Sequence, residues 1–350
     1  MYCKKCGSEI DNDSLFCSKC GQKINSENNS INSNNDFFVR GGVLEKYLGN
    51  DIDVIIPDDV FEISNEAFKE CRQLTSIKLS SNVEVAHIID CDKLNKIEVN
   101  AGIKKLFVHN CPMISDIELP FGIKEFGFAR SGIRSITIPA SVKNIKARAF
   151  EECKSLQTVV LPDSVEAIEW RAFYRCAELK SINLSDNIHT LGKEAFRQCE
   201  KLENIHISSK ISVLPAGVFQ ECHSLTEVVI PFGVTRLEGA DGDSGWYSST
   251  GAFMECKNLK KVALPDSITF MHGHSFMGCK SLNELVMSNT LYDRYAHRLT
   301  TLGDKHNSYI TGFKNTPISW KFAECCQHCG NKFEGIFNKK CSRCGKPKDY

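Results

Sequence analysis

Residues 153–176 read CKSLQTVVLPDSVEAIEWRAFYRC, and this stretch decides the fold. In its first half, Leu156, Val159 and Leu161 form a short apolar pattern that ends at Pro162, which predicts a short strand followed by a turn. A shorter apolar pair follows the turn, and an Ala-Phe pair precedes the next cysteine. The apolar positions are Leu156, Val159, Leu161, Val165, Ile168, Ala172 and Phe173. One such unit cannot bury its own apolar side, so we expect equivalent units to stack on one another.

The unit repeats along the chain, and a cysteine marks each repeat. The spacing between these cysteines is 20 residues near the start, 23 later and 34 once, and Arg130 takes the equivalent place between the third and the fourth. The marking residues are Cys71, Cys91, Cys111, Cys153, Cys176, Cys199, Cys222, Cys256 and Cys279. A phenylalanine stands three residues before most of them, at Phe68, Phe150, Phe173, Phe196, Phe219, Phe253 and Phe276. The sequence therefore predicts ten stacked units with internal ladders of Leu, Val or Ile, Phe and Cys.

Three stretches carry this pattern most clearly: DVIIPDDVFEISNEAF (53–68), VVLPDSVEAIEWRAFYRC (159–176) and INLSDNIHTLGKEAFRQC (182–199). They resemble leucine-rich repeats of the BspA-like class. The resemblance covers residues 37–290 and implies a repeat solenoid, mostly β with short turns or 3-10 segments. VRGGVLEKYLGNDIDVIIP (39–57) looks like the entry hairpin that caps such arrays. Residues 291–324 break the repeat, and we expect them to cap the last coil, with a short helix in LYDRYAHRLTTL (291–302).

The units between residues 71 and 130 are three residues shorter and lack the Ala-Phe turn. We expect tighter coils there. The side chains expected to replace the phenylalanine are Ile88, Val108 and either Phe126 or Phe128.

The regularly spaced cysteines have two interpretations. One is redox sensing or a stacked series of disulfides; the other is that cysteine acts as a small apolar residue in a crowded turn. No basic side chain recurs beside the thiols to lower their pKa. The pattern therefore favours the structural interpretation.

Each end of the chain has two C-x2-C pairs, each followed by glycine, which is the spacing of four thiolate ligands around one structural zinc ion. The ligands are Cys3, Cys6, Cys17 and Cys20 at the start, and Cys326, Cys329, Cys341 and Cys344 at the end. Cys325 and His328 are alternative ligands in the second set. Both ends resemble short zinc-ribbon modules of bacterial proteins, which places ribbons at residues 1–24 and 325–350. A polar linker, residues 25–36, follows the first ribbon.

The chain contains 43 Lys and Arg against 43 Asp and Glu, so a chain-wide basic field for nucleic acid is excluded. Only the C-terminal ribbon is locally basic, which leaves weak nucleic-acid binding there as an alternative. No apolar run suits a membrane helix, and the opening MYCKKCGSEI has no export signal. We expect a cytoplasmic location.

Catalytic motifs are missing from the sequence: there is no G-x-S-x-G, no Gly-rich phosphate loop and no H-E-x-x-H. His272 and His274 share a turn, where a histidine pair is usually solvated rather than bound to metal. The spacing from Cys222 to Cys256 is eleven residues longer than the usual 23, and the extra residues lie within the insertion EGADGDSGWYSST (238–250). It lacks the acidic residue that completes a calcium loop. Its Trp246 and Tyr247 either contact a partner or fold back as a lid.

In each predicted strand, one residue lies between two inward-facing apolar residues and so points out. This outward row reads Lys78, Glu98, Glu118, Thr137, Val160, Asn183, His206, Val229, Ala263 and Val286. It is charged at its start and more apolar later, near the insertion. The sequence therefore predicts a non-enzymatic scaffold that binds a protein partner through Val160, Val229, Ala263, Val286, Trp246 and Tyr247. A cell-surface adhesion protein is the other alternative that the resemblance implies.

Overall fold

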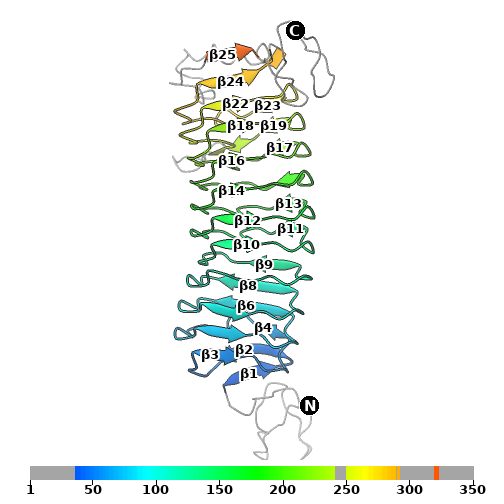
Figure 1. The fold of residues 1–350 in the computed structure, drawn as a ribbon, viewed down its shortest axis with the longest axis vertical. Helices are drawn as coiled ribbons and strands as arrows, with labels where there is room; N and C mark the ends of the chain where they lie inside the picture. The colour runs from blue at the N-terminus through cyan, green and yellow to red at the C-terminus, as the bar shows by residue number, and fades with distance from the viewer. Residues whose placement is uncertain (1–35, 241–249, 289, 292–318, 323–350) are drawn as a thin grey trace, which may run out of the picture.

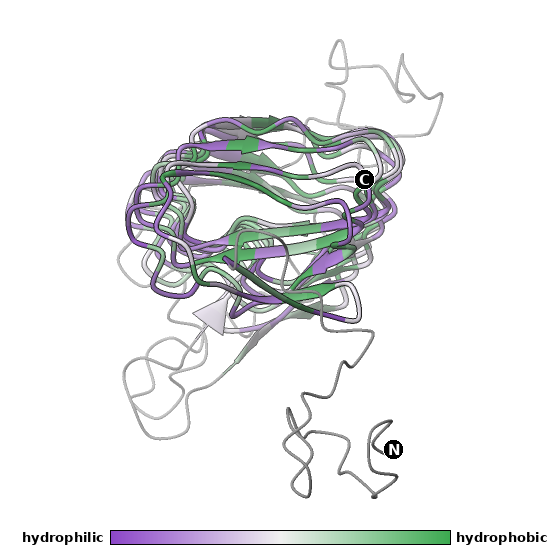
Figure 2. Ribbon diagram, turned by 90° about the horizontal axis from the view of Figure 1, so that it is seen from below, coloured by the Kyte–Doolittle hydropathy of each residue, from purple (hydrophilic) through white to green (hydrophobic). Residues whose placement is uncertain are grey.

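The chain forms a stack of similar coils, elongated along the stacking direction (Figure 1). The computed structural model describes residues 36–240, 250–288 and 290–291, and the backbone of 319–322. Most coils contribute one short strand to each of two opposite sheets, which we call sheet A and sheet B. Viewed along the stack, the coils superpose with the strands on two sides (Figure 2). The predicted repeat solenoid is confirmed.

Sheet A is parallel and consists of three blocks of hydrogen-bonded strands. Equivalent residues lie directly over one another, as Ile136, Val159, Ile182 and Ile205 do. The first block is β3 (Asp53–Ile55), β5 (Ser76–Lys78) and β7 (Lys96–Glu98). The second is β10 (Ser135–Thr137), β12 (Thr158–Val160), β14 (Ser181–Ile182) and β16 (Asn204–Ile205). The third is β18 (Glu227–Val229), β22 (Lys261–Ala263), β24 (Glu284–Met287) and β25 (Ser319–Phe322).

Sheet B runs along the opposite side and begins with the predicted entry hairpin. Strands β1 (Phe37–Arg40) and β2 (Val43–Tyr47) pair antiparallel, and both turn residues, Gly41 and Gly42, have positive φ. Parallel strands continue from β2: β4 (Glu62–Ile63), β6 (Val85–Ile89), β8 (Lys105–His109) and β9 (Glu125–Gly127). Two further blocks are β11 (Asn144–Ile145), β13 (Ala167–Ile168) and β15 (Thr190–Leu191), then β17 (Val213–Leu214), β19 (Arg236–Leu237) and β23 (Phe270–Met271).

The C-terminal part of the array is described only in places. Residues 290–291 are helical, and the rest of the helix predicted over 291–302 lies outside the described residues. Strand β25 pairs in parallel with β24, so the segment after the last repeat adds a strand to sheet A. The insertion leaves and re-enters the array through a short antiparallel pair, β20 (Gly239–Ala240) and β21 (Thr250–Gly251).

The interior is built from side-chain ladders that run along the stack. Six of the repeated phenylalanines, from Phe150 to Phe276, form a continuous pile of nearly parallel rings. Neighbouring ring centres lie 5.1 to 5.5 Å apart, with interplanar angles of 18° or less. All of these rings are buried. Burial of an aromatic ring is a large apolar contribution to stability, so the pile is a principal stabilising element of the array.

The shorter early coils replace the phenylalanine as the sequence predicts. Ile88 and Val108 are fully buried at that position. Phe128 continues the ring pile, with its centre 5.9 Å from that of Phe150, while Phe126 packs beside both rings. Of the two alternatives, Phe128 therefore takes the phenylalanine position.

The repeated cysteines hydrogen-bond between coils. From Cys153 to Cys279, each Sγ donates to the backbone carbonyl of the phenylalanine in the preceding coil, at 2.9 to 3.2 Å. All nine thiols of the ladder are buried and free. Cysteine fits this position because its side chain is small and its thiol can donate a hydrogen bond. This agrees with the interpretation of the repeated cysteines as structural residues.

The prediction that Arg130 occupies the cysteine position is wrong: Ser131 does. In every coil the residue before the ladder position has a positive φ, and in this coil that residue is Arg130, with φ of 59°. Ser131 is 4% exposed, and its Oγ donates to the Val108 carbonyl at 2.7 Å. The turn after Ser131 is one residue shorter than in other coils, because Gly132 packs on the Pro112 carbonyl where no Cβ would fit. Because of this missing residue, counting along the repeat points to Arg130, one position before Ser131.

Replacing Ser131 tests whether a donor is required at this position. Ser131→Ala should lower the free energy of unfolding by about 1–2 kcal/mol, because it removes a buried donor. Ser131→Cys restores a donor of the type used elsewhere and should cost clearly less. Denaturant unfolding of both variants measures the difference, and equal losses would contradict the role of the hydrogen bond.

Candidate interaction surface on sheet A

The outward row of sheet A lies where the sequence predicts it. Val160 is 52% exposed and Val229 is 60% exposed, whereas Ala263 and Val286 are half-buried. Trp246 and Tyr247 lie outside the described residues, as do both sets of zinc-ligand cysteines. The structure thus places four of the six predicted partner-binding residues on one face.

Charges on this face are paired at its two ends. Glu98 lies 2.6 Å from the Lys96 ammonium and 3.4 Å from that of Lys78, and Lys261 lies 3.3 Å from Glu284. Between these ends, three outward positions are acidic, at Asp116, Glu118 and Glu227. The others carry uncharged side chains and one histidine: Ser135, Thr137, Thr158, Val160, Ser181, Asn183, Asn204, His206 and Val229. The outward positions between the two ends of sheet A therefore carry carboxylates but no Lys or Arg.

Sheet A is interrupted at residues 117–119. This segment occupies the place of a strand between β7 and β10 but forms none, and its backbone makes no ladder hydrogen bond with either neighbour. The link to the next coil is the Arg134 N–H, which donates to the Ser115 carbonyl at 3.0 Å. The interruption falls where the spacing between ladder positions changes from 20 residues to 22, at Ser131. The strands before it therefore belong to shorter coils than the strands after it.

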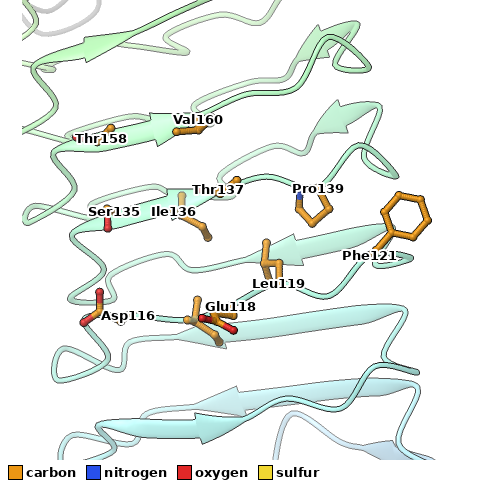
Figure 3. Close-up of a pocket in the computed structure, with 11 residues that line it drawn as sticks. Asp116, Glu118, Leu119, Phe121, Ser135, Ile136, Thr137, Pro139, Thr158 and Val160 are labelled. Atoms are coloured by element: carbon orange, nitrogen blue, oxygen red, sulfur yellow. The ribbon is translucent and has the colours of Figure 1, made fainter.

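A groove of about 620 Å³ lies at this interruption (Figure 3). One wall is the segment Asp116–Leu119 with Phe121, and the other is Ser135–Pro139 with two residues of the next coil. Ile117 is half-buried, as Ile97 is in the preceding coil, whereas Ile136 and Val159 in the next two coils are buried. Leu119 is half-buried, like Val99 and Leu161 at the same position of other coils. Phe121 is 80% exposed and projects from the end of its segment. The exposed apolar surface of the groove is therefore mainly that of Phe121, together with Val160, which is 52% exposed.

The same groove contains two carboxylates without a counter-charge. Within the described part of the chain, neither Asp116 nor Glu118 forms an ion pair, and Asp116 accepts one hydrogen bond, from Ser115 Oγ at 2.8 Å. No Lys or Arg lines the groove. Of the predicted partner-binding residues, Val160 belongs to the groove, whereas Val229, Ala263 and Val286 lie further along sheet A.

A second cluster lies on the edge beside sheet B, and its charges pair with one another. Trp170 lies between the guanidinium groups of Arg148 and Arg171, at 4.5 and 4.9 Å from its ring centre. Arg171 also pairs with Glu194, which in turn pairs with Arg197 at 2.7 Å. These contacts join successive coils, so we assign the cluster to stability rather than to binding.

Histidines do not assemble a metal or catalytic centre in the described ranges. His87 stacks on Phe107 with ring centres 4.8 Å apart, and burial lowers the pKa of His87 and of His109, which keeps both neutral. The rings of His272 and His274 contact each other, with their centres 5.1 Å apart, and both residues are half-buried beside the insertion. They are therefore not freely solvated. Across residues 36–240 and 250–291, no group of three or more metal-binding side chains occurs.

The described residues include no helix that is both long and apolar enough to cross a membrane.

Comparison with known proteins gives the family. A model of the BspA type leucine rich repeat region matches six copies, over residues 48–127, 121–240 and 247–302. A zinc-ribbon domain model matches residues 2–24, and the C-terminal cysteine set lies beyond both matches. No curated protein matches the chain.

Similar solved structures include a leucine rich cell surface protein from Faecalibacterium prausnitzii. It is 19% identical, with 84% of this chain and 94% of that chain covered and a TM-score of 0.45. A leucine-rich repeat protein from Bacteroides ovatus is 19% identical, with 80% of this chain and 94% of that chain covered and a TM-score of 0.37. The T. pallidum leucine rich repeat protein is 21% identical, with 81% of this chain and 97% of that chain covered and a TM-score of 0.35. Because the repeat model matches well over half of the chain, this protein belongs to the BspA-type leucine-rich repeat family.

Proposed function

We propose that this chain is a non-enzymatic scaffold that binds a partner protein through the outward face of sheet A, centred on the groove. The observation that carries the proposal is the groove itself, where exposed apolar side chains lie beside two carboxylates that form no ion pair among the described residues. Exposed apolar surface of this kind marks interaction sites. Leucine-rich repeat arrays generally serve protein interaction, which supports the same function.

Capture of partners by the purified full-length chain tests this function. Phe121→Ser with Val160→Glu should weaken capture by about tenfold or more, because both changes remove apolar contact from the groove. The control is Lys261→Glu with Glu284→Lys, which exchanges a charge pair near the far end of the same face. Captured proteins are then cross-linked and the contact residues mapped. Loss of capture in the control, with capture intact in the groove variant, would place the binding site elsewhere.

We also propose that the chain binds two structural zinc ions and works in the cytoplasm. The zinc-ribbon match over residues 2–24 supports the first site. The second rests on the cysteine spacing at the C-terminus. Two thiol-rich sites together with nine free ladder thiols suit a reducing compartment.

Elemental analysis of reductively purified protein should give two zinc ions per chain. Cys326→Ser should reduce the count to one, whereas Cys325→Ser should leave it at two. Chelation should unfold only the two ends, since zinc provides about 10–16 kcal/mol to ribbons of this size. The described part of the array brings no three metal-binding side chains together. A cooperative loss of all β structure on chelation would contradict this separation.

A further inference from the structure

We propose that the groove binds an extended segment of the partner in which cationic and bulky apolar residues alternate, and that the segment pairs with the open backbone of residues 117–119. This inference rests on the proposed function and names the chemistry of the partner. Its grounds are the unpaired backbone, the unpaired charges and the exposed apolar side chains of one site.

The backbone is the first ground. The other segments of sheet A form strands with at least one neighbour, whereas residues 117–119 form none and face β10 without a ladder bond. Backbone N–H and C=O groups require partners, and an added strand is a common way to provide them. The wall from Asp116 to Phe121 is six residues long, so it matches an extended segment of about 20 Å.

Charge is the second ground. Glu98 occupies the position equivalent to Glu118 in the preceding coil, and there two lysines neutralise it. Asp116 and Glu118 have no such partner among the described residues, and the groove lining adds no cation. A Lys or Arg on the bound segment would therefore complete the pattern of the neighbouring coil.

Apolar contact is the third ground and fixes the direction of the alternation. Leu119, Phe121 and Pro139 lie together at one end of the groove, away from Asp116 (Figure 3). Successive side chains of an extended segment point in opposite directions. Every second side chain of the bound segment therefore faces the groove, and those between them face solvent. We place the cationic residue of the segment at the Asp116 end and the bulky apolar residue beside Phe121.

The same charges disfavour two other occupants. A twofold contact between copies of this chain through the groove would bring Asp116 and Glu118 near their own equivalents, which repel. Nucleic acid would place phosphates against the same carboxylates. A cationic protein segment meets neither obstacle.

Fluorescence anisotropy with labelled peptides tests the inference on the full-length protein at about 150 mM salt, where screening suppresses weak long-range attraction. The probe is an eight-residue peptide of alternating Lys and Val that ends in Phe. Its counterpart has Glu in place of every Lys. We expect the Lys peptide to bind at least about tenfold more tightly than the Glu peptide. Equal binding of the two, or no binding of either, would overturn the proposal.

Protein variants and a modified peptide locate the contact. Asp116→Asn with Glu118→Gln should weaken the Lys peptide by about tenfold, whereas the matched pair Glu203→Gln with Glu227→Gln, exposed on the same side of the array, should not. Methylation of alternate peptide nitrogens should also weaken binding, because it blocks strand pairing. Equal effects of the two variant pairs, or no effect of methylation, would contradict the proposed mode. If partner capture depends on Phe121 and Val160 while the peptide does not bind, the scaffold function stands and this mode of recognition is wrong.

Discussion

Raising the pH from 8 to 10 should unfold the array, because it forces buried thiols to ionise. Burial raises the pKa of Cys153 to about 12, and burial also raises the pKa values of the following four ladder cysteines above their ordinary value of 9.0. The folded state therefore holds these protons above pH 9, whereas the unfolded chain releases them. The stabilisation is complete below pH 9 and is lost as the pH rises towards the folded-state pKa values.

The expected size of this effect is large. Each thiol costs about 1.4 kcal/mol of stability for one pH unit above its unfolded pKa, so five thiols cost about 7 kcal/mol at pH 10. That loss is comparable to the 5–15 kcal/mol that stabilises a typical domain. Circular dichroism and denaturant unfolding between pH 7 and pH 11, with reductant present, measure it.

A serine variant provides the control for alkaline unfolding. Cys176→Ser with Cys199→Ser keeps small donors, as Ser131 does in its own coil, but removes two groups that ionise. The dependence of stability on pH between 9 and 10 should then fall by about two fifths. A free energy of unfolding that stays constant from pH 8 to 10.5 would show that the thiols are not protected by burial.

Phe196→Ala should lower the free energy of unfolding by about 3–5 kcal/mol. The ring of Phe196 lies in the middle of the pile, 5.2 Å from Phe173 and 5.5 Å from Phe219, and it is fully buried. Its removal leaves a cavity and separates the rings on either side. Because each coil contacts only its neighbours, the loss should also divide unfolding into two steps.

Phe121→Ala is the matched control, since it removes the same side chain from an exposed position. It should change the free energy of unfolding by less than about 0.5 kcal/mol. Denaturant titration of both variants makes the comparison. A similar loss in the two variants would mean that the ring pile contributes little to stability.

The repeat itself was determined by the sequence alone. A cysteine every 20 or 23 residues, with a phenylalanine three residues before it, identifies the coil, its inward side chains and the outward row of sheet A. These features are periodic, and a period can be counted without a structure because each coil has the same local geometry. The entry hairpin was equally predictable, since two glycines separate its apolar runs.

The tertiary structure decided the features that depart from the period. Ser131 holds the cysteine position because a hydrogen bond to Val108 and a positive φ at Arg130 place it there, whereas the count along the chain pointed to Arg130. The interruption at residues 117–119 depends on whether strands of neighbouring coils meet in register, which is a property of two coils and not of one. The groove, and with it the exposure of Phe121 and the unpaired Asp116, follows from that mismatch of coil lengths.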